Sequence, residues 1–303
     1  MTPSKTQWDC GDIPDLRGRV AVVTGPTSGI GKEAARALAE KHASVVLAVR
    51  NESKGQAVAD EFRAECADAD VSVRVLDLAD LHSIGAFAQS ILTDFDRLDL
   101  LVNNAGIMMC PYARTRDGFE IQFGTNHLGH FSLTGQLLPL LTKTSGSRVV
   151  IVSSLAHRRG KLDFSDLNWT SRKYVTTQAY MDSKLANVYF AYELANLLSD
   201  HGDNPTVTIA HPGWTATELQ RHKKSLALLN HFLGQNAAMG ALPTLRAALD
   251  DTALPGDFFG PGKHFEMHGY PVKVESTPAA RDRETARELW RVSQEMTGVM
   301  YYL

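Results

Sequence analysis

The chain has 303 residues, of which 44% are hydrophobic and 21% charged, which is typical of a globular protein. Its 31 lysine and arginine residues against 34 aspartate and glutamate residues give a net charge of −3, which offers no reason to expect nucleic acid or an anionic membrane as a partner. No apolar stretch approaches the ~18 residues of a membrane span, and the first residues lack the apolar core of a signal peptide, so we expect a cytoplasmic protein.

Strands buried on both faces are predicted wherever apolar residues run almost without interruption. These runs cover residues 19–24, 44–49, 71–76, 98–102, 148–153 and 206–210. Segments with helical periodicity follow the first five of them, at 32–41, 52–66, 81–95, 119–142 and 179–199. Continuous rather than alternating apolar runs are typical of a parallel sheet that is covered by helices on both sides.

The predicted architecture is therefore α/β. Because strand–helix–strand crossovers are right-handed, we expect a single-domain, doubly wound Rossmann-type fold with a mostly parallel sheet. No composition break divides the chain, so the domain is expected to span 17–303 after an N-terminal tail at 1–16.

A glycine-rich turn joins the first strand to the first helix. Its glycines follow the spacing GxxxGxG, which allows a tight turn, a close approach of the backbone to a diphosphate, and a helix N-terminus whose N–H groups face an anion. The candidate cofactor-binding residues in this turn are Gly25, Thr27, Ser28, Gly29, Ile30 and Gly31.

Arg50 closes the second strand, where sheets that bind NAD usually carry an acidic residue for the ribose hydroxyls. A carboxylate would repel a 2′-phosphate, whereas arginine binds one with two parallel hydrogen bonds. This position favours NADP(H) over NAD(H), with Lys54 as a second candidate. The alternative is an arginine that is simply solvated.

The third and fourth strands end in further candidate ligands of the cofactor. The carboxyl edge of such a sheet is where ligands bind, although plain strand termination is the alternative. The candidates are Asp77 and Leu78, for the adenine, and Asn104, Ala105 and Gly106.

Tyr180 and Lys184 lie four residues apart, so they share one face of the predicted helix. A phenol normally titrates near pH ~10, and an adjacent ammonium favours the phenolate, which brings the group toward acid–base duty. Ser153 and Ser154 end the fifth apolar run, where a hydroxyl could polarise a carbonyl. Alternation along a strand points them to opposite faces, so only one can serve.

Three cysteines, Cys10, Cys66 and Cys110, are widely spread and form no CxxC, so neither a disulfide framework nor a structural zinc site is predicted. His264 and His268 lie four apart without the rest of a metal motif, and we expect a strand or loop there and no metal.

The motifs TGPTSGIG, DL, NNAG, SS, YMDSK and HPGWTAT, with Asn126, resemble the short-chain dehydrogenase/reductases in order and spacing, from about residue 17 to 298. AVRNESKG, FGTNHLGHFSLT, VSSLAH and YMDSKLANVYF are similar to the retinol dehydrogenase-like branch of that family.

This resemblance implies a role for each matching residue. Tyr180 would act as the general acid during reduction, and Lys184 would hold the nicotinamide ribose. Ser154 would bond the reacting oxygen, and Asn126 would order a water in a proton relay. The resemblance also implies self-association and a turn that contacts the nicotinamide, formed by Pro212, Gly213 and Thr217.

The residues around this predicted site are mostly apolar and indicate a small lipophilic substrate. The pocket candidates are Met108, Met109, Tyr112, Leu155 and Trp214. The segment at about 214–240 is a candidate substrate loop, and its apolar stripe is equally compatible with a lid, a core face or a subunit interface. The stripe consists of Leu226, Leu229, Phe232 and Leu233.

We therefore expect an NADP(H)-dependent carbonyl reductase or alcohol dehydrogenase. One alternative is reduction of a different bond on the same fold, as in light-dependent protochlorophyllide reductase. A second is a non-catalytic, NADP(H)-sensing interaction protein, against which the intact Ser–Tyr–Lys set argues.

Overall fold

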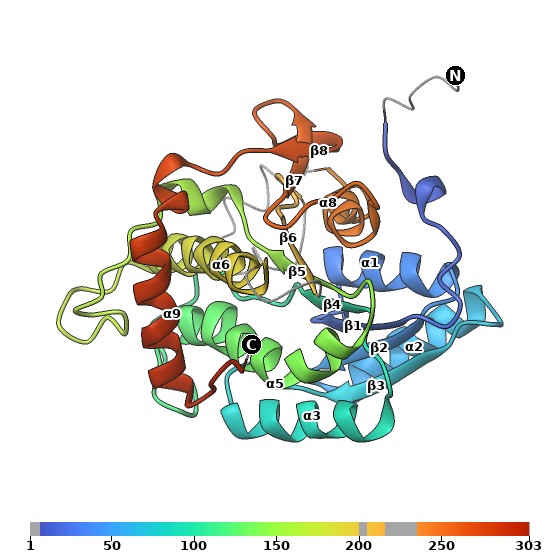
Figure 1. Ribbon diagram of the computed structural model, residues 1–303, viewed down its shortest axis with the longest axis horizontal. Helices are drawn as coiled ribbons and strands as arrows, with labels where there is room; N and C mark the ends of the chain where they lie inside the picture. The colour runs from blue at the N-terminus through green and yellow to red at the C-terminus, as the bar shows by residue number, and fades with distance from the viewer. Residues whose placement is uncertain (1–6, 200–204, 216–234, 303) are drawn as a thin grey trace.

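The computed structural model describes residues 7–199, 205–215 and 235–302, which form one sheet with helices on both faces (Figure 1). The eight strands lie in the order β3-β2-β1-β4-β5-β6-β7-β8, and only β8 is antiparallel to its neighbour. The strands are β1 (Val20–Thr24), β2 (Ser44–Val49), β3 (Val71–Val75), β4 (Leu100–Asn103), β5 (Arg148–Val152), β6 (Thr206–Ala210), β7 (Phe258–Lys263) and β8 (His268–Val274).

This arrangement confirms the doubly wound, mostly parallel fold. The strand order reverses between β1 and β4, which are parallel neighbours. At such a switch point the loops that leave the two strands turn to opposite faces of the sheet, and a crevice opens at their carboxyl ends.

Two hydrophobic cores lie on the two faces of the sheet. Side chains alternate along β1, so Val20 and Val22 pack in one core while Ala21 and Val23 pack in the other. The second core takes α1 (Gly29–Glu40), α2 (Glu52–Glu65) and α8 (Ala237–Leu249). The first takes α3 (Leu81–Asp94), α5 (Gly129–Lys143), α6 (Thr176–Ser199) and α9 (Arg283–Thr297), which lie together on the opposite face in Figure 1.

Several boundaries differ from those predicted. Helix α1 begins at Gly29 rather than residue 32, because Gly29 and Gly31, which were assigned to the turn, lie in the helix's first turn. The predicted helix at 119–142 is three pieces: α4 (Ile121–Phe123), a π-helical turn (Gly124–Leu128) and α5. Strand β7 and helices α8 and α9 were not predicted, and the strand or loop expected at 264–268 is the turn between β7 and β8 with the first residue of β8. Short 3₁₀ helices cover Cys10–Asp12, Leu155–Arg159 and Pro278–Arg281.

The end of the N-terminal segment is part of the folded body. Ile13 and Leu16, which the sequence placed in a tail, are buried in the core beside α1. The Leu16 N–H donates to the Lys41 carbonyl over 2.7 Å. Thr217 and the apolar stripe at 226–233 lie outside the described residues.

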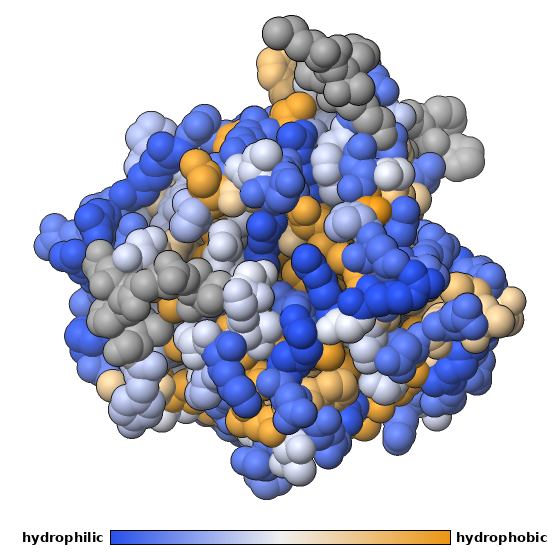
Figure 2. All heavy atoms as spheres, turned by 45° about the vertical axis from the view of Figure 1, so that its right-hand side comes forward, coloured by the Kyte–Doolittle hydropathy of each residue, from blue (hydrophilic) through white to orange (hydrophobic). Residues whose placement is uncertain are grey.

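The surface of the described residues is mixed in character. Figure 2 shows hydrophobic side chains interspersed with hydrophilic ones over the face it draws. Within the described ranges, no helix is long and apolar enough to cross a bilayer. Cys10, Cys66 and Cys110 are free thiols.

An aromatic cluster fixes the C-terminal helix against the helices that carry the site. Phe131 on α5, Phe190 on α6 and Trp290 on α9 pack around Tyr301, whose ring centroid lies 4.5 Å from that of Trp290. The Tyr301 hydroxyl donates to the Phe131 carbonyl over 2.7 Å. These aromatic contacts fix the positions of α5, α6 and α9 relative to one another.

Candidate active site

A cavity of about 1220 Å³ opens at the carboxyl edge of the sheet. That volume exceeds the ~300–1,000 Å³ of ordinary small-molecule pockets and leaves room for two ligands side by side. One end is lined by the glycine turn and the ends of β2, β3 and β4, and we call it the cofactor end. The other end, lined by residues 107–113, 154–156 and 212–215 among others, is the substrate end.

The N-terminus of α1 faces the cofactor end. Its N-cap residue, Ser28, makes no side-chain cap bond, so the first N–H groups of the helix remain available to an anion. A Cβ at position 31 would lie 2.3 Å from Asn104 Nδ2 and 2.6 Å from the Gly25 carbonyl, so only glycine fits there. The cavity lining includes Gly25, Thr27, Ser28, Gly29, Ile30 and Gly31.

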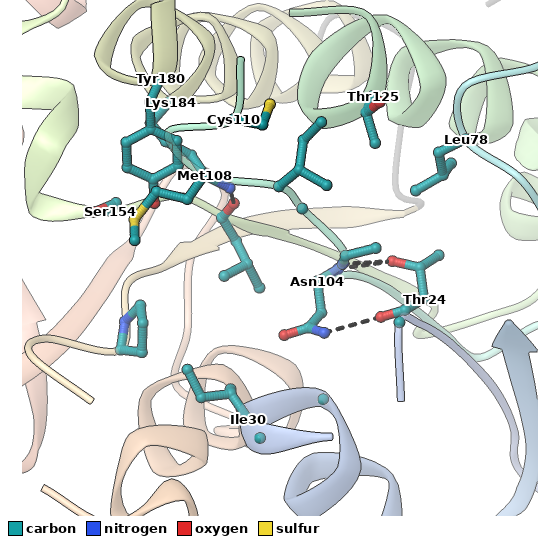
Figure 3. A pocket seen from close by; sticks show the side chains of 18 of the residues that line it. Thr24, Ile30, Leu78, Asn104, Met108, Cys110, Thr125, Ser154, Tyr180 and Lys184 are labelled. Carbon is teal, nitrogen blue, oxygen red and sulfur yellow. Dashed lines mark hydrogen bonds between the residues drawn. The ribbon is translucent and has the colours of Figure 1, made fainter. Parts of the chain in front are cut away.

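Thr24 holds the turn after β4, a connection that sequence reasoning missed. Its Oγ1 accepts from the N–H groups of Asn104 and Ala105, both over 2.9 Å (Figure 3). The Thr24 hydroxyl also lies 3.0 Å from His130 Nε2, while His130 Nδ1 lies 3.0 Å from the Asn126 carbonyl. A carbonyl only accepts, so Nδ1 carries the proton and Nε2 accepts from Thr24.

Burial makes that tautomer possible, because it lowers the pKa of His130 to about 4 and keeps the ring neutral. The neutral ring links β1 to the π-helical turn that carries Asn126. The only sequence signal for this contact was a pair of polar histidines in an apolar helical run.

Arg50 lies at the carboxyl end of β2, is exposed, and lines the cavity together with Asn51 and Lys54. In the described part of the chain, the Arg50 guanidinium has no carboxylate partner. Asp77 and Leu78 line the same end, and Asp77 Oδ1 accepts from the Ala79 N–H over 3.0 Å.

Tyr180 and Lys184 project from one face of α6 into the cavity, and Ser154 approaches from the end of β5 (Figure 3). The Ser154 hydroxyl lies close enough to the Tyr180 phenol to lower its pKa. Lys184 Nζ lies 6.0 Å from the centre of the Tyr180 ring and donates to the Val152 carbonyl over 3.2 Å. Ser153 points away and donates to the Lys184 carbonyl over 2.8 Å, so Ser154 is the serine whose hydroxyl reaches the phenol.

The electrostatics of this group differ from the simple expectation. Burial raises the pKa of Tyr180, opposed by the hydrogen bond from Ser154. Burial also lowers the pKa of Lys184 to about 8. The phenol is therefore protonated at neutral pH, and desolvation outweighs the expected influence of the ammonium on it. A protonated phenol suits the role of proton donor.

Asn126 is fully buried in the π-helical turn. Its Oδ1 accepts from the Ile107 N–H over 2.8 Å, and its Nδ2 donates to the Ile107 carbonyl and to Ser183 Oγ, both over 2.9 Å. The side chain thus ties the segment after β4 to α6. Its participation in a water relay stays a prediction.

The turn after β6 closes the cavity at the junction of the two ends, where Pro212 and Gly213 line it. Gly213 has φ +67°, and a Cβ there would lie 2.5 Å from the Met267 carbonyl. Both the backbone conformation and the lack of space therefore require glycine. That same carbonyl accepts from the Trp214 N–H over 2.9 Å. The loop between β7 and β8 is therefore docked on this turn.

A chain of ionic hydrogen bonds reinforces the docking. The Gly213 N–H donates to His211 Nδ1 over 3.2 Å, so the ring's proton is on Nε2, which donates to Glu266 over 3.0 Å. Arg158, just after the serine pair, donates to the other oxygen of Glu266 over 2.6 Å. Glu266 was not predicted as part of the site, because it lies more than 50 residues from either partner.

The substrate end is rich in sulfur and apolar side chains. All five predicted pocket residues line it: Met108, Met109, Tyr112, Leu155 and Trp214. Met181, Met267 and Cys110 join them, and burial raises the pKa of the Cys110 thiol, which disfavours the thiolate. Among the side chains that the structure describes, no group of three histidine, cysteine or acidic residues could hold a metal ion.

Comparison with known proteins gives a consistent result. The family model described as short chain dehydrogenase matches residues 19–226. Retinol dehydrogenase 12 of Homo sapiens is 42% identical over 297 residues, covering 96% of this chain and 90% of that protein. The crystal structure of an uncharacterized protein from Mycobacterium Paratuberculosis superposes with a TM-score of 0.83 at 41% identity, covering 98% of this chain and 100% of that one.

A more distant structure contains a nucleotide. It is a short chain dehydrogenase from Shigella flexneri in complex with NADP, with a TM-score of 0.62 and 28% identity, covering 78% of this chain and 94% of that one.

Proposed function

The chain belongs to the short chain dehydrogenase family of oxidoreductases, and we propose that it transfers a hydride between NADP(H) and a lipophilic carbonyl or alcohol substrate. One observation carries this proposal. Tyr180, Ser154 and Lys184 meet in the same cavity as the uncapped N-terminus of α1, so a dinucleotide bound on that helix would extend toward the phenol.

The residues at the cofactor end fit a phosphorylated dinucleotide. The free N–H groups of α1 suit its diphosphate, and the close packing at Gly31 brings the backbone near it. Arg50 and Lys54 offer two exposed cations at the end of β2, where a 2′-phosphate would lie. The NADP complex of the Shigella flexneri relative supports this choice over NAD(H).

Bound NADPH would supply the hydride, which goes to the carbonyl carbon of the substrate. The remaining steps belong to this chain's own side chains. Ser154 donates a hydrogen bond to the substrate oxygen, where negative charge develops. Tyr180 Oη gives its proton to that oxygen, which yields the alcohol. The ammonium of Lys184 stabilises the phenolate that remains, and oxidation of an alcohol runs through the same steps in reverse.

The substrate end supports a lipophilic substrate. Its lining offers methionine side chains, which are flexible and polarisable and adapt to irregular apolar groups. The name of the human relative, retinol dehydrogenase 12, indicates that the same scaffold accepts a long apolar alcohol. We propose medium- to long-chain aldehydes, ketones or the matching alcohols as the substrate class.

The test mixes the purified protein with NADPH or NADH and a panel of aliphatic, aromatic and polyene aldehydes, and follows the absorbance of the reduced nicotinamide. We expect consumption of NADPH with apolar carbonyls, and slower consumption of NADH. The Tyr180→Phe variant, which lacks the proton donor, serves as the negative control. Tight binding of NADPH without consumption across the whole panel would contradict catalysis and favour the sensing role.

A further inference from the structure

Two amide side chains on one helical run clamp the segment that forms a wall of the substrate end. Asn126 and Gln122 are four residues apart, about one helical turn. They bond Ile107 and Met109, which are two residues apart in the segment after β4. The two contacts therefore follow one another along both the helical run and the segment after β4.

Both ends of the Gln122 amide are hydrogen bonded. Its Oε1 accepts from the Met109 N–H over 2.8 Å, and its Nε2 donates to the Thr176 carbonyl over 3.0 Å and to Tyr174 Oη over 2.7 Å. Tyr174 in turn donates to the buried carboxylate of Glu120 over 2.8 Å. Since a backbone N–H only donates and a carbonyl only accepts, the amide orientation is fixed.

The clamp holds Met109 in an unfavourable backbone conformation. Its φ of +52° lies in the left-handed region, which costs a residue with a side chain about 1 kcal/mol or more. The next residue, Cys110, is held as well, because its carbonyl accepts from Thr176 Oγ1 over 2.7 Å. Gln122 and Thr176 therefore hold two consecutive residues, Met109 and Cys110.

The residue between the two clamped ones, Met108, borders the substrate end, as Ile107 and Met109 do. With the N–H groups of Ile107 and Met109 both directed at the clamping amides, Met108 lies at the cavity, beside Tyr180 and Ser154 in Figure 3. Thr176 is the first residue of α6 and lies one turn before Tyr180. Gln122 thus sets the distance between the Met108 wall and the phenol, although Gln122 itself does not line the cavity.

We propose that Gln122 is a positioning residue for substrate specificity, which acts through Met109 and Thr176 to limit the size of the group beside the substrate's carbonyl carbon. This inference rests on the proposed function, because it assumes that the carbonyl binds at Tyr180 and Ser154. We therefore expect the protein to prefer unbranched aldehydes over carbonyl compounds in which the carbon next to the carbonyl is branched.

The experiment replaces Gln122 with leucine, which keeps the bulk and removes all three bonds. We expect the kcat/KM ratio of a linear to an α-branched aldehyde of equal carbon number to fall about 10-fold, mainly through a lower KM for the branched one. The kcat for the linear aldehyde and the affinity for NADPH should change less than about 3-fold. An unchanged ratio, or an equal loss of kcat for both aldehydes, would overturn the proposal.

The matched control is Gln136→Leu on α5, which loses one bond to Ser132 and lies outside the cavity lining. It should leave the ratio unchanged. A fall of the ratio in this control as large as in Gln122→Leu would mean that general loosening, not the clamp, sets specificity.

A second measurement does not depend on turnover. Hydrogen exchange at the Met109 amide should accelerate about 10-fold or more in Gln122→Leu. In Gln122→Glu, which keeps an acceptor for that N–H, exchange should stay close to wild type while the aldehyde ratio still falls. If the wild type consumes no NADPH, the proposed function fails. Independently of that result, Met109 amide exchange at the wild-type rate in both variants would refute the clamp.

Discussion

The cofactor end of the cavity is built from segments that each directly follow a strand, whereas the substrate end is built from side chains far apart in the sequence. Gly25, Arg50, Asp77 and Asn104 all come within two residues of the end of β1, β2, β3 or β4. Position relative to a strand is enough to bring such residues together. The substrate end instead depends on hydrogen bonds between distant segments, such as those of Gln122 and Glu266. The first kind of site can therefore be predicted from a sequence, whereas for the second the sequence predicted lining residues but not the hydrogen bonds that hold them.

The largest effect is expected where the two ends meet. Tyr180→Phe removes the proton donor and should lower kcat about 10³-fold, while NADPH affinity stays within about 3-fold, because positioned acids contribute at this scale. Steady-state kinetics and fluorescence titration of NADPH would measure the two values.

The control for this change is Tyr189→Phe on the same helix, whose hydroxyl donates to the Ala279 carbonyl away from the cavity. It should keep nearly full turnover. Comparable turnover in Tyr180→Phe and wild type would remove Tyr180 from the mechanism.

Arg50→Asp tests the cofactor end alone. The charge-assisted bonds to a 2′-phosphate are replaced by repulsion, so the Kd for NADPH should rise about 10- to 100-fold and that for NADH far less. Lys173→Asp, an equal change of charge at an exposed site outside the cavity lining, is the control. Equal weakening of both nucleotides by Arg50→Asp would argue against a phosphate contact.

The pH dependence of carbonyl reduction tests the role of Lys184. The pKa of Lys184 is about 8, so the ammonium is present below that pH and lost above it. Carbonyl reduction should slow about tenfold from pH ~7 to pH ~9, because the forming phenolate loses its stabilising charge. The Lys184→Arg variant stays charged, and its profile should lack this inflection. A wild-type profile that rises through this range would rule out the assigned role.

The last expected effect is on stability, not on activity, and it comes from the buried histidines behind both ends. Burial lowers the pKa of His127 to about 3 and of His130 and His157 to about 4, from 6.5. The unfolded chain binds protons first as the pH falls below 6.5, so stability present above that pH is lost. At pH ~5.5 the loss should be about 1 kcal/mol per histidine.

Urea unfolding at pH ~7.5 and ~5.5 would measure this loss, and His157→Gln should reduce it by about a third. Equal unfolding midpoints at the two pH values would show that these rings are not held neutral.

Much of the fold could be predicted because the first six strands are continuous apolar runs. Strand β7 was missed since Gly260, Pro261 and Gly262 weaken any strand signal, although this half of the strand pairs only with β8 and can tolerate them. Helix α1 starts earlier than predicted, because Gly31 is a packing residue under Asn104 and not a turn residue. The π-helical turn leaves no trace in the hydrophobic periodicity, so the exact placement of Asn126 had to come from the structure.

The single antiparallel strand, β8, has a consequence for how this scaffold diversifies. Because it reverses the chain after β7, the loop at 264–267 returns to the edge where Met267 faces the cavity. Among the described residues, the hydrogen bonds that this loop makes outside the β7–β8 hairpin go to the turn after β6, to His211 and to Arg158, and none goes to the glycine turn or to Arg50. Exchanging it between relatives would therefore alter the substrate end and the turn that it docks on, while the glycine turn and Arg50 are inherited unchanged.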